Sequence, residues 1–262
     1  MLITFDLDGV LVENAFGNYI FPEIKNILKD QYKNKFNVKN GKLEKKIWDK
    51  IMKQFQKKID SNKAYEAYDW DLIVNDTAQK MDIPVNVDVK KLVRKYCSKE
   101  FLHLHQASHD LLNYLNKKEN KLIIITNGYS KYQLPVLEYF KIISYFQKII
   151  TADRAKAVKP SKKIFNKAIG NSKNKWIHIG DSVLMDIFGA GRLDAKTLLI
   201  KRDLPDNLLK LSPRKRAKDK KAKKIMREMA ERENRLHHIS YTNKEIYSDY
   251  IISSLKEIRN IL

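Results

Sequence analysis

Cysteine is nearly absent from this sequence. The single residue Cys97 excludes an intrachain disulfide, and no CxxC pair is available for a zinc site. No apolar run approaches the roughly 20 residues that a membrane-spanning helix needs. No basic stretch followed by an apolar one precedes the first predicted strand, so we expect no secretory signal. These absences together predict a cytoplasmic protein with no membrane association.

Acidic residues are few relative to basic ones. The chain has 52 Lys and Arg against 31 Asp and Glu, which gives a net charge of +21. A phosphate-bearing or nucleic-acid partner would explain the excess. A general richness in lysine that leaves solvated surface side chains also explains it, and is the simpler explanation for the chain as a whole. The 262 residues, 43% of them hydrophobic, suffice for one large α/β domain or for a core plus a smaller domain.

The N-terminus carries the first candidate for chemistry. An apolar run at residues 2–5 is followed by Asp6, Leu7, Asp8 and Gly9, which predicts a buried strand that ends at a sharp turn. The pleat of a strand sends Asp6 and Asp8 to the same side. Two adjacent carboxylates repel each other, and a divalent cation relieves that repulsion. The pair therefore fits a metal-assisted nucleophile and proton donor.

Three later segments combine an apolar run with polar residues. Residues 122–125 lead into Thr126, Asn127 and Gly128. Lys159 stands before Pro160, after the apolar pair at 149–150. Residues 176–180 form another apolar run, which is followed by the acids Asp181 and Asp186.

Strands and helices alternate from residue 121 onward. Strands are predicted at 121–126, 148–151, 175–180, 197–200 and 250–252, and helices at 133–140, 162–169, 184–190 and 254–261. This alternation predicts an α/β fold with a doubly wound parallel sheet and helices on both faces. Ligands of such sheets bind outside the carboxyl ends of the strands, which groups Asp6, Asp8, Thr126 and Asp181 at one edge.

Residues 17–102 read as helical throughout, with apolar residues at helical spacing and no strand signal. The pair Asn40-Gly41 predicts a turn between two of these helices. The segment contains Trp48, Tyr65, Tyr68 and Trp70. We expect most of these aromatic side chains to form the core of the helical segment, and one or two to face a ligand.

In this order and context, the four polar segments resemble the haloacid dehalogenase-like (HAD) hydrolase superfamily. The resemblance extends from the N-terminus to about Arg202 and resumes at residues 249–255. It implies a Rossmann-like catalytic core formed by residues 1–16 and 103–262. It also implies an all-helical cap domain of the C1 type at residues 17–102, which selects the substrate. Asp8 favours the phosphatase branch, because dehalogenases of this group do not carry an aspartate at that position.

The resemblance assigns roles to individual residues. Asp6 resembles the nucleophile that forms an aspartyl-phosphate, and Asp8 the general acid and then the general base. The phosphate would be bound by Thr126, Lys159 and the backbone around Asn127 and Gly128. Mg²⁺ would be held by Asp6, by Asp8 through its backbone carbonyl, and by Asp181. Asp186 would be a further ligand or would support the site from behind.

A basic segment at 204–240 departs from the resembled pattern, which has a short loop at this place. Ser212-Pro213 predicts a helix start, and the apolar positions Ala222, Ile225, Met226 and Met229 predict one buried stripe. The nine Lys and Arg residues at 214–227 are opposed only by Asp219. A solvated helix packed on the core explains this segment, and so does an anion-binding arm at the catalytic edge of the sheet. Nucleic acid could bind through 212–227, but this is not our expectation.

The sequence thus predicts a Mg²⁺-dependent phosphatase that hydrolyses a small phosphate monoester, such as a nucleotide, a sugar phosphate or phosphoglycolate. A phosphomutase with the same aspartates is an alternative, and so is a nucleic-acid-binding protein that kept the scaffold. The substrate, the cap residues that select it and the oligomeric state are not given by the sequence.

Overall fold

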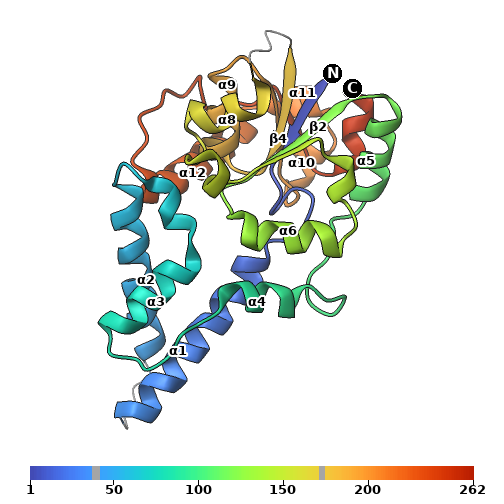
Figure 1. The fold of residues 1–262 in the computed structure, drawn as a ribbon. Coiled ribbons are helices and arrows are strands. Elements are labelled where there is room, and N and C mark those ends of the chain that lie inside the picture. The colour runs from blue at the N-terminus through green and yellow to red at the C-terminus, as the bar shows by residue number, and fades with distance from the viewer. Residues whose placement is uncertain (37–41, 171–174) are drawn as a thin grey trace.

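A computed structural model describes residues 1–36, 42–170 and 175–262 of the chain. Its centre is a six-stranded parallel sheet in the order β3-β2-β1-β4-β5-β6. The strands are β1 (Leu2–Phe5), β2 (Lys121–Ile125), β3 (Lys148–Ile150), β4 (Trp176–Gly180), β5 (Lys196–Ile200) and β6 (Tyr250–Ile252). The predicted doubly wound α/β fold is confirmed, with helices on both faces of the sheet (Figure 1).

The central strands are buried on both faces. Ile3 and Phe5 of β1 and Ile124 and Ile125 of β2 are fully inaccessible to solvent. Strands that are covered on both faces by helices read as continuous apolar runs rather than as alternating patterns. That is why these short runs could be recognised as strands in the sequence.

Most helices of the core lie at or near their predicted positions. The helices are α5 (Ser108–Lys117), α6 (Ser130–Tyr139), α7 (Ala152–Ala155) and α8 (Lys162–Ile169). The predicted helix at 184–190 is instead a π-helical segment, Val183–Phe188, followed by the short α9 (Gly189–Gly191). It widens because Ile187 N and Asp186 N both donate to Ser182 O, each at 3.2 Å. The last helix, Leu255–Asn260, has 3₁₀ geometry.

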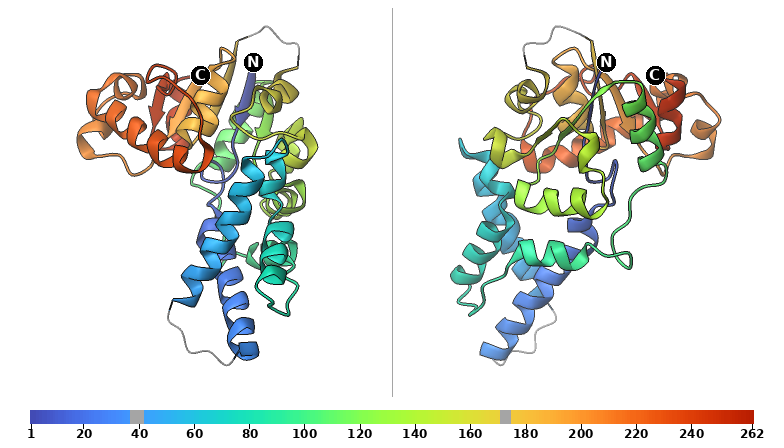
Figure 2. Two further views of the ribbon diagram at one scale, coloured as in Figure 1. Left: turned by 90° about the vertical axis from the view of Figure 1, so that its left-hand side faces the viewer. Right: turned by 45° about the vertical axis from the view of Figure 1, so that its right-hand side comes forward.

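The described part of residues 16–96 consists of helices joined by short irregular connections, and no strand occurs among residues 17–36 and 42–102. The elements are the π-helical Phe16–Ile20, α1 (Phe21–Phe36), α2 (Leu43–Ile59), the 3₁₀ segment Ala64–Tyr68, α3 (Trp70–Lys80) and α4 (Val89–Tyr96). They project together beyond the carboxyl edge of the sheet, and α4 packs against α6 (Figures 1 and 2). The predicted turn at Asn40-Gly41 lies outside the described residues. The division into a core and a cap domain stays a prediction.

The basic segment forms three helices, α10 (Asp206–Leu209), α11 (Pro213–Lys218) and α12 (Lys220–His237). The predicted apolar stripe is present: Ala222, Met226 and Met229 are buried and Ile225 is partly buried. The stripe packs on the π-helical segment Val183–Phe188 in an apolar cluster separate from the main core.

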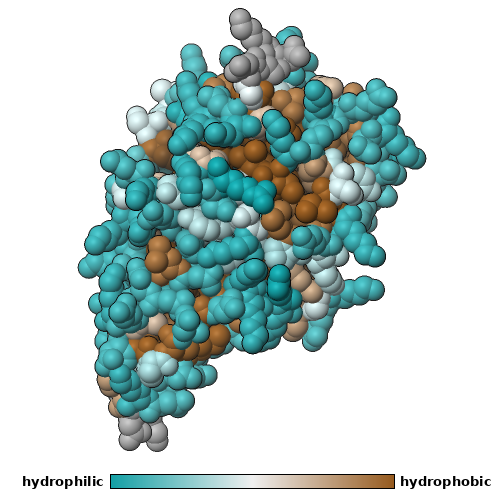
Figure 3. Space-filling view, in the orientation of Figure 1, coloured by the Kyte–Doolittle hydropathy of each residue, from teal (hydrophilic) through white to brown (hydrophobic). Residues whose placement is uncertain are grey.

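The molecular surface is mostly hydrophilic on the face shown in Figure 3. Within the described ranges, no helix has the length and apolar character that crossing a membrane requires.

Candidate active site

Polar side chains from three strands meet at the carboxyl edge of the sheet. Asp6 follows β1, Thr126 follows β2 and Asp181 follows β4. Gly9 makes the turn after β1 with φ at +76°, and a Cβ atom there would lie 2.1 Å from Asp181 Oδ2. Arg202, just beyond β5, holds the same turn by donating to the carbonyl oxygens of Gly9 and Val10. The glycine therefore lets the first and fourth strands bring their acids together.

Three carboxylates form one cluster. An oxygen atom from each of Asp6, Asp181 and Asp186 lies within 4.8 Å of the others. Burial and the charges of Asp6 and Asp186 hold the pKa of Asp181 well above its usual value. Burial also raises the pKa of Asp6, against the opposing effect of Lys159. The cluster thus has an excess of negative charge that a bound cation would relieve.

Lys159 is the buried cation of the cluster, with only 2% of its surface exposed. Its Nζ lies 2.8 Å from Asp6 Oδ1 and 2.7 Å from Asp186 Oδ1. Burial opposes its charge, but the two carboxylates outweigh burial and raise the pKa of Lys159. Burial likewise opposes ionisation of Asp186, but Lys159 and His178 outweigh it and lower the pKa of that carboxyl. Lys159 and Asp186 are therefore a fixed ion pair behind Asp6.

Asp8 points away from this cluster and toward α6. Its Oδ2 accepts a hydrogen bond of 2.9 Å from Gln133 Nε2. Burial and the charge of Asp6 raise the pKa of Asp8 to about 7. Gly128 makes room for the amide, because a Cβ at that position would lie 2.1 Å from Gln133 Nε2. Asp8 is thus oriented by a neutral donor and can both hold and release a proton near neutral pH.

A buried histidine supports the acids from inside the sheet. His178 of β4 places Nε2 3.1 Å from Asp186 Oδ1 and Nδ1 2.7 Å from Thr4 Oγ1. Both His178 and Thr4 are fully buried. His178, Thr4 and Gln133 were not predicted as site residues. The only signal was a histidine inside the apolar run 176–180 and a glutamine one turn into α6.

The predicted phosphate-binding segment lies next to the acids. Thr126 is buried, and its Oγ1 accepts from Gly128 N at 3.1 Å. The side chain of Asn127 bonds to two other segments. Its Oδ1 accepts a hydrogen bond from Lys159 N at 2.7 Å, and its Nδ2 donates one to Tyr68 Oη at 3.1 Å. Asn127 therefore joins the lysine segment to the helices of residues 16–96.

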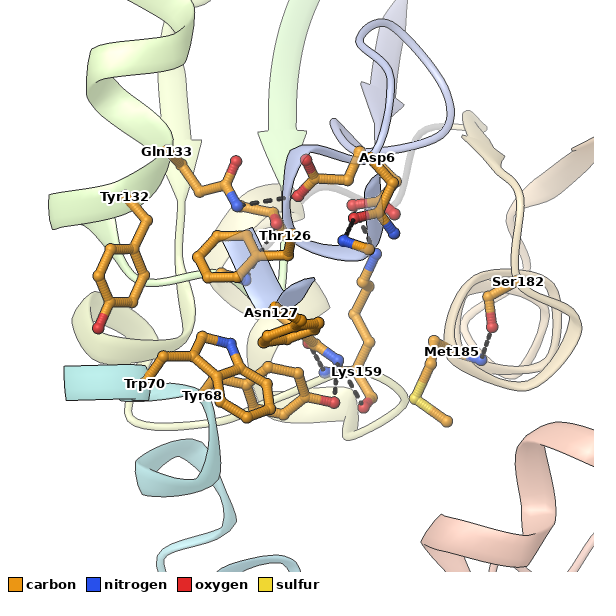
Figure 4. Close-up of a pocket in the computed structure, with 16 residues that line it drawn as sticks. Asp6, Tyr68, Trp70, Thr126, Asn127, Tyr132, Gln133, Lys159, Ser182 and Met185 are labelled. Atoms are coloured by element: carbon orange, nitrogen blue, oxygen red, sulfur yellow. Dashed lines mark hydrogen bonds and ion pairs between the residues drawn. The ribbon is translucent and has the colours of Figure 1, made fainter. Parts of the chain in front are cut away.

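A cavity of about 250 Å³ opens in front of these groups. One side is polar, with the acids Asp6 and Asp8 and the side chains of Thr126 and Lys159. Asp6, Thr126 and Lys159 are labelled in Figure 4. The other side is aromatic and is lined by Phe16, Phe21, Tyr68, Trp70 and Tyr132. Of the four aromatic residues noted in the sequence, Tyr68 and Trp70 line the cavity, whereas Trp48 and Tyr65 do not.

The basic segment contributes little positive charge to this cavity. Arg216 was predicted to be one of the solvated cations, and this is wrong, because it is 3% exposed and paired with Glu257 at 2.8 Å. Arg214, Lys218 and Lys223 line another cavity together with Lys196, the first residue of β5, and Tyr250, the first of β6. That cavity lies at the amino edge of the sheet, opposite the acids.

The acid cluster lies at the carboxyl edge of the parallel sheet, where α/β proteins of this kind bind their ligands. The family profile described as haloacid dehalogenase-like hydrolase matches residues 3–200. The chain belongs to this family of hydrolases.

Individual proteins are also similar to this chain. Pyrimidine 5'-nucleotidase PynA of Streptococcus pneumoniae is 30% identical over 96 residues, which span 35% of this chain and 40% of that protein. A HAD phosphatase from Thermococcus onnurineus superposes with a TM-score of 0.67 and 20% identity over 99% of this chain and 96% of its own. The HAD-hydrolase YfnB from Bacillus subtilis gives a TM-score of 0.58 and 17% identity over 100% and 97%. At these identities the two structures establish the fold alone.

Proposed function

We propose that this protein is a Mg²⁺-dependent phosphatase that hydrolyses a small phosphate monoester through an aspartyl-phosphate on Asp6. The observation that carries the proposal is the pairing of two differently controlled acids at one cavity. Asp6 is held by Lys159 at 2.8 Å, whereas Asp8 is held by the neutral Gln133 at 2.9 Å. Burial raises the pKa of both acids, but the adjacent Lys159 opposes this rise at Asp6, whereas the pKa of Asp8 reaches about 7. A cation beside one carboxyl group favours the charged form that a nucleophile needs, and a raised pKa at the other suits a proton donor.

In the first half of the reaction, a carboxylate oxygen of Asp6 attacks phosphorus and the bond from phosphorus to the leaving oxygen breaks. Asp8 gives its proton to that oxygen, which leaves as the alcohol. In the second half, Asp8 takes a proton from water, whose oxygen attacks phosphorus and releases inorganic phosphate from Asp6. Thr126 and Lys159 offer donors to the phosphoryl oxygens throughout.

The donor set fits magnesium, which prefers carboxylate, carbonyl and water oxygens. Three carboxylates with one lysine leave uncompensated negative charge. Asp6, Asp181 and the backbone carbonyl of Asp8 would hold the ion. Asp186 supports the site from behind, because its Oδ1 is bonded to Lys159 and His178 and its Oδ2 accepts from Ser182 N at 3.1 Å. The bound ion would offset the charge on the phosphoryl oxygens.

The aromatic side of the cavity supports a substrate whose alcohol carries a flat ring. Phe16, Phe21, Trp70 and Tyr132 contact one another as ring pairs with centroids 4.6 to 6.3 Å apart. Such rings favour stacking with a planar group. The similarity to a pyrimidine 5'-nucleotidase supports the same substrate class, a nucleoside monophosphate.

The test is a comparison of phosphate release from cytidine or uridine monophosphate, ribose 5-phosphate, phosphoglycolate and glycerol phosphate, with magnesium and with a chelator. We expect the nucleotides to give the highest kcat/KM and the chelator to abolish release. Hydrolysis that is independent of magnesium would refute the metal assignment, and equal kcat/KM values would refute the ring preference. Isomerised sugar phosphate in place of free phosphate would instead identify a phosphomutase. RNA binding without hydrolysis would identify a binding protein.

A further inference from the structure

The turn between the acids Asp181 and Asp186 is held by a glutamate from the basic segment. Glu233 of α12 accepts three hydrogen bonds from this turn. Its Oε2 accepts from Ser182 Oγ at 2.6 Å and from Leu184 N at 2.7 Å, and its Oε1 accepts from Val183 N at 3.1 Å. One side chain thus takes both backbone donors that follow Ser182.

The same turn positions both acids. Ser182 N donates to Asp186 Oδ2 at 3.1 Å, and Ser182 Oγ accepts from Met185 N at 3.0 Å. The donors of the turn are therefore divided between Asp186 on one side and Glu233 on the other. A turn fixed at both sides leaves little freedom to the peptide that carries Asp181.

Glu233 reaches this turn because α12 packs on the π-helical segment Val183–Phe188. The buried stripe of α12 lies in one apolar cluster with Val183, Leu184, Ile187 and Phe188. The helix is itself capped, because Asp219 Oδ1 accepts from Lys221 N and Ala222 N at 2.7 and 3.3 Å. The part of the chain that departs from the family pattern therefore contacts the active site through one carboxylate.

We propose that Glu233 is a positioning residue, which holds the turn at 182–184 so that Asp181 and Asp186 stay arranged for the cation. The inference rests on the proposed magnesium-dependent function. It assigns a role to the basic segment at 204–240: support of the metal site, distinct from the attraction of substrate. Groups that orient metal ligands without touching the metal contribute substantially to affinity.

The isosteric variant Glu233→Gln separates this role from packing. If the amide oxygen of the introduced glutamine takes the place of Oε2, it still accepts hydrogen bonds from Leu184 N and Ser182 Oγ, but the amide NH₂ group then faces the donor Val183 N. If the amide is turned, the NH₂ group faces Leu184 N instead. Either orientation places two donors against each other, so at least one backbone bond is lost without a change in volume. Glu231→Gln, at an exposed position of the same helix, is the matched control.

The experiment is titration calorimetry of magnesium chloride into the metal-free full-length protein, together with thermal melting of each variant. We expect Glu233→Gln to raise the Mg²⁺ Kd about tenfold or more, and Glu231→Gln to leave it unchanged. The kcat of Glu233→Gln should recover at saturating magnesium. An unchanged Kd in a folded Glu233→Gln variant would overturn the inference while leaving the proposed function intact.

Two further results keep the outcomes distinct. If Glu233→Gln is unfolded at the assay temperature, Ser182→Ala deletes one of the three bonds and leaves the carboxylate, and an unchanged Kd in that variant also overturns the inference. If the unmodified protein binds no magnesium, the proposed function fails, and the inference fails with it.

Discussion

Arg216 offers a sharp test of how the basic segment is built. Its guanidinium donates to Leu208 O at 2.9 Å, Leu209 O at 3.0 Å, Ile251 O at 3.3 Å and Glu257 Oε2 at 2.8 Å. Replacing it by methionine keeps most of the apolar volume and removes all of these donors. Removal of one partner from a buried ion pair costs about 3–5 kcal/mol.

The lower end of that range applies here. Glu257 keeps Ser253 N as a donor at 2.7 Å, and its side chain is 23% exposed, so water can reach it. Leu208 O keeps a second donor, Leu211 N, at 3.0 Å. We therefore expect Arg216→Met to lower the free energy of unfolding by about 3 kcal/mol, which corresponds to roughly 6–12 °C in Tm for a chain of this size.

Urea unfolding followed by circular dichroism measures this change, with Arg214→Met as the matched control. Arg214 is exposed and lies two positions earlier on the same helix. We expect its replacement to change stability by no more than about 0.5 kcal/mol. Equal effects of the two substitutions would refute the structural role of Arg216.

Three further substitutions test the site. Asp8→Asn should lower kcat by about 10²–10⁴ for an alkyl phosphate and much less for 4-nitrophenyl phosphate, whose leaving group needs no proton; equal losses in steady-state assays would contradict the acid role. Lys159→Met should abolish measurable turnover and also lower stability by about 3–5 kcal/mol, because Asp6 and Asp186 lose their cation; full activity in a folded variant would exclude it from the site. Tyr68→Phe should leave the KM for a nucleotide unchanged and cost about 1 kcal/mol in urea unfolding, because Asn127 loses an acceptor while the ring stays; a large rise in KM would show that the hydroxyl binds substrate.

The parts of the fold and site that could be predicted from the sequence are local patterns. The strands at 122–125 and 176–180 are continuous apolar runs, and the parallel sheet follows from their alternation with helices. The rule that ligands bind at the carboxyl ends of such strands placed Asp6, Thr126 and Asp181 together without any knowledge of contacts. The structure brings these residues to one edge of the sheet, where Asp6 and Thr126 line the cavity and Asp181 lies in the carboxylate cluster with Asp6.

The remaining parts depend on contacts between distant segments. Gln133 reaches Asp8 only because α6 lies against Gly128, which has no Cβ to block it. His178 and Thr4 are neighbours because β1 pairs with β4. The sequence of neither strand predicts this pairing. The burial of Arg216 could not be predicted, because a run of Lys and Arg residues has no periodicity that distinguishes a buried residue from the exposed ones. The π-helical turn at Val183–Phe188 arises from a shared acceptor, Ser182 O, which propensity does not reveal.

The central claim is that Asp6 carries the phosphoryl group during turnover. The most direct measurement is acid quenching of the enzyme during hydrolysis of a substrate labelled in its phosphate, followed by mapping of the labelled peptide. Our account predicts a label on Asp6 that survives acid and is removed by hydroxylamine, as an acyl phosphate is, and no label in Asp6→Asn. Turnover of the unmodified enzyme without any protein-bound label, or a label that persists in Asp6→Asn, would contradict it.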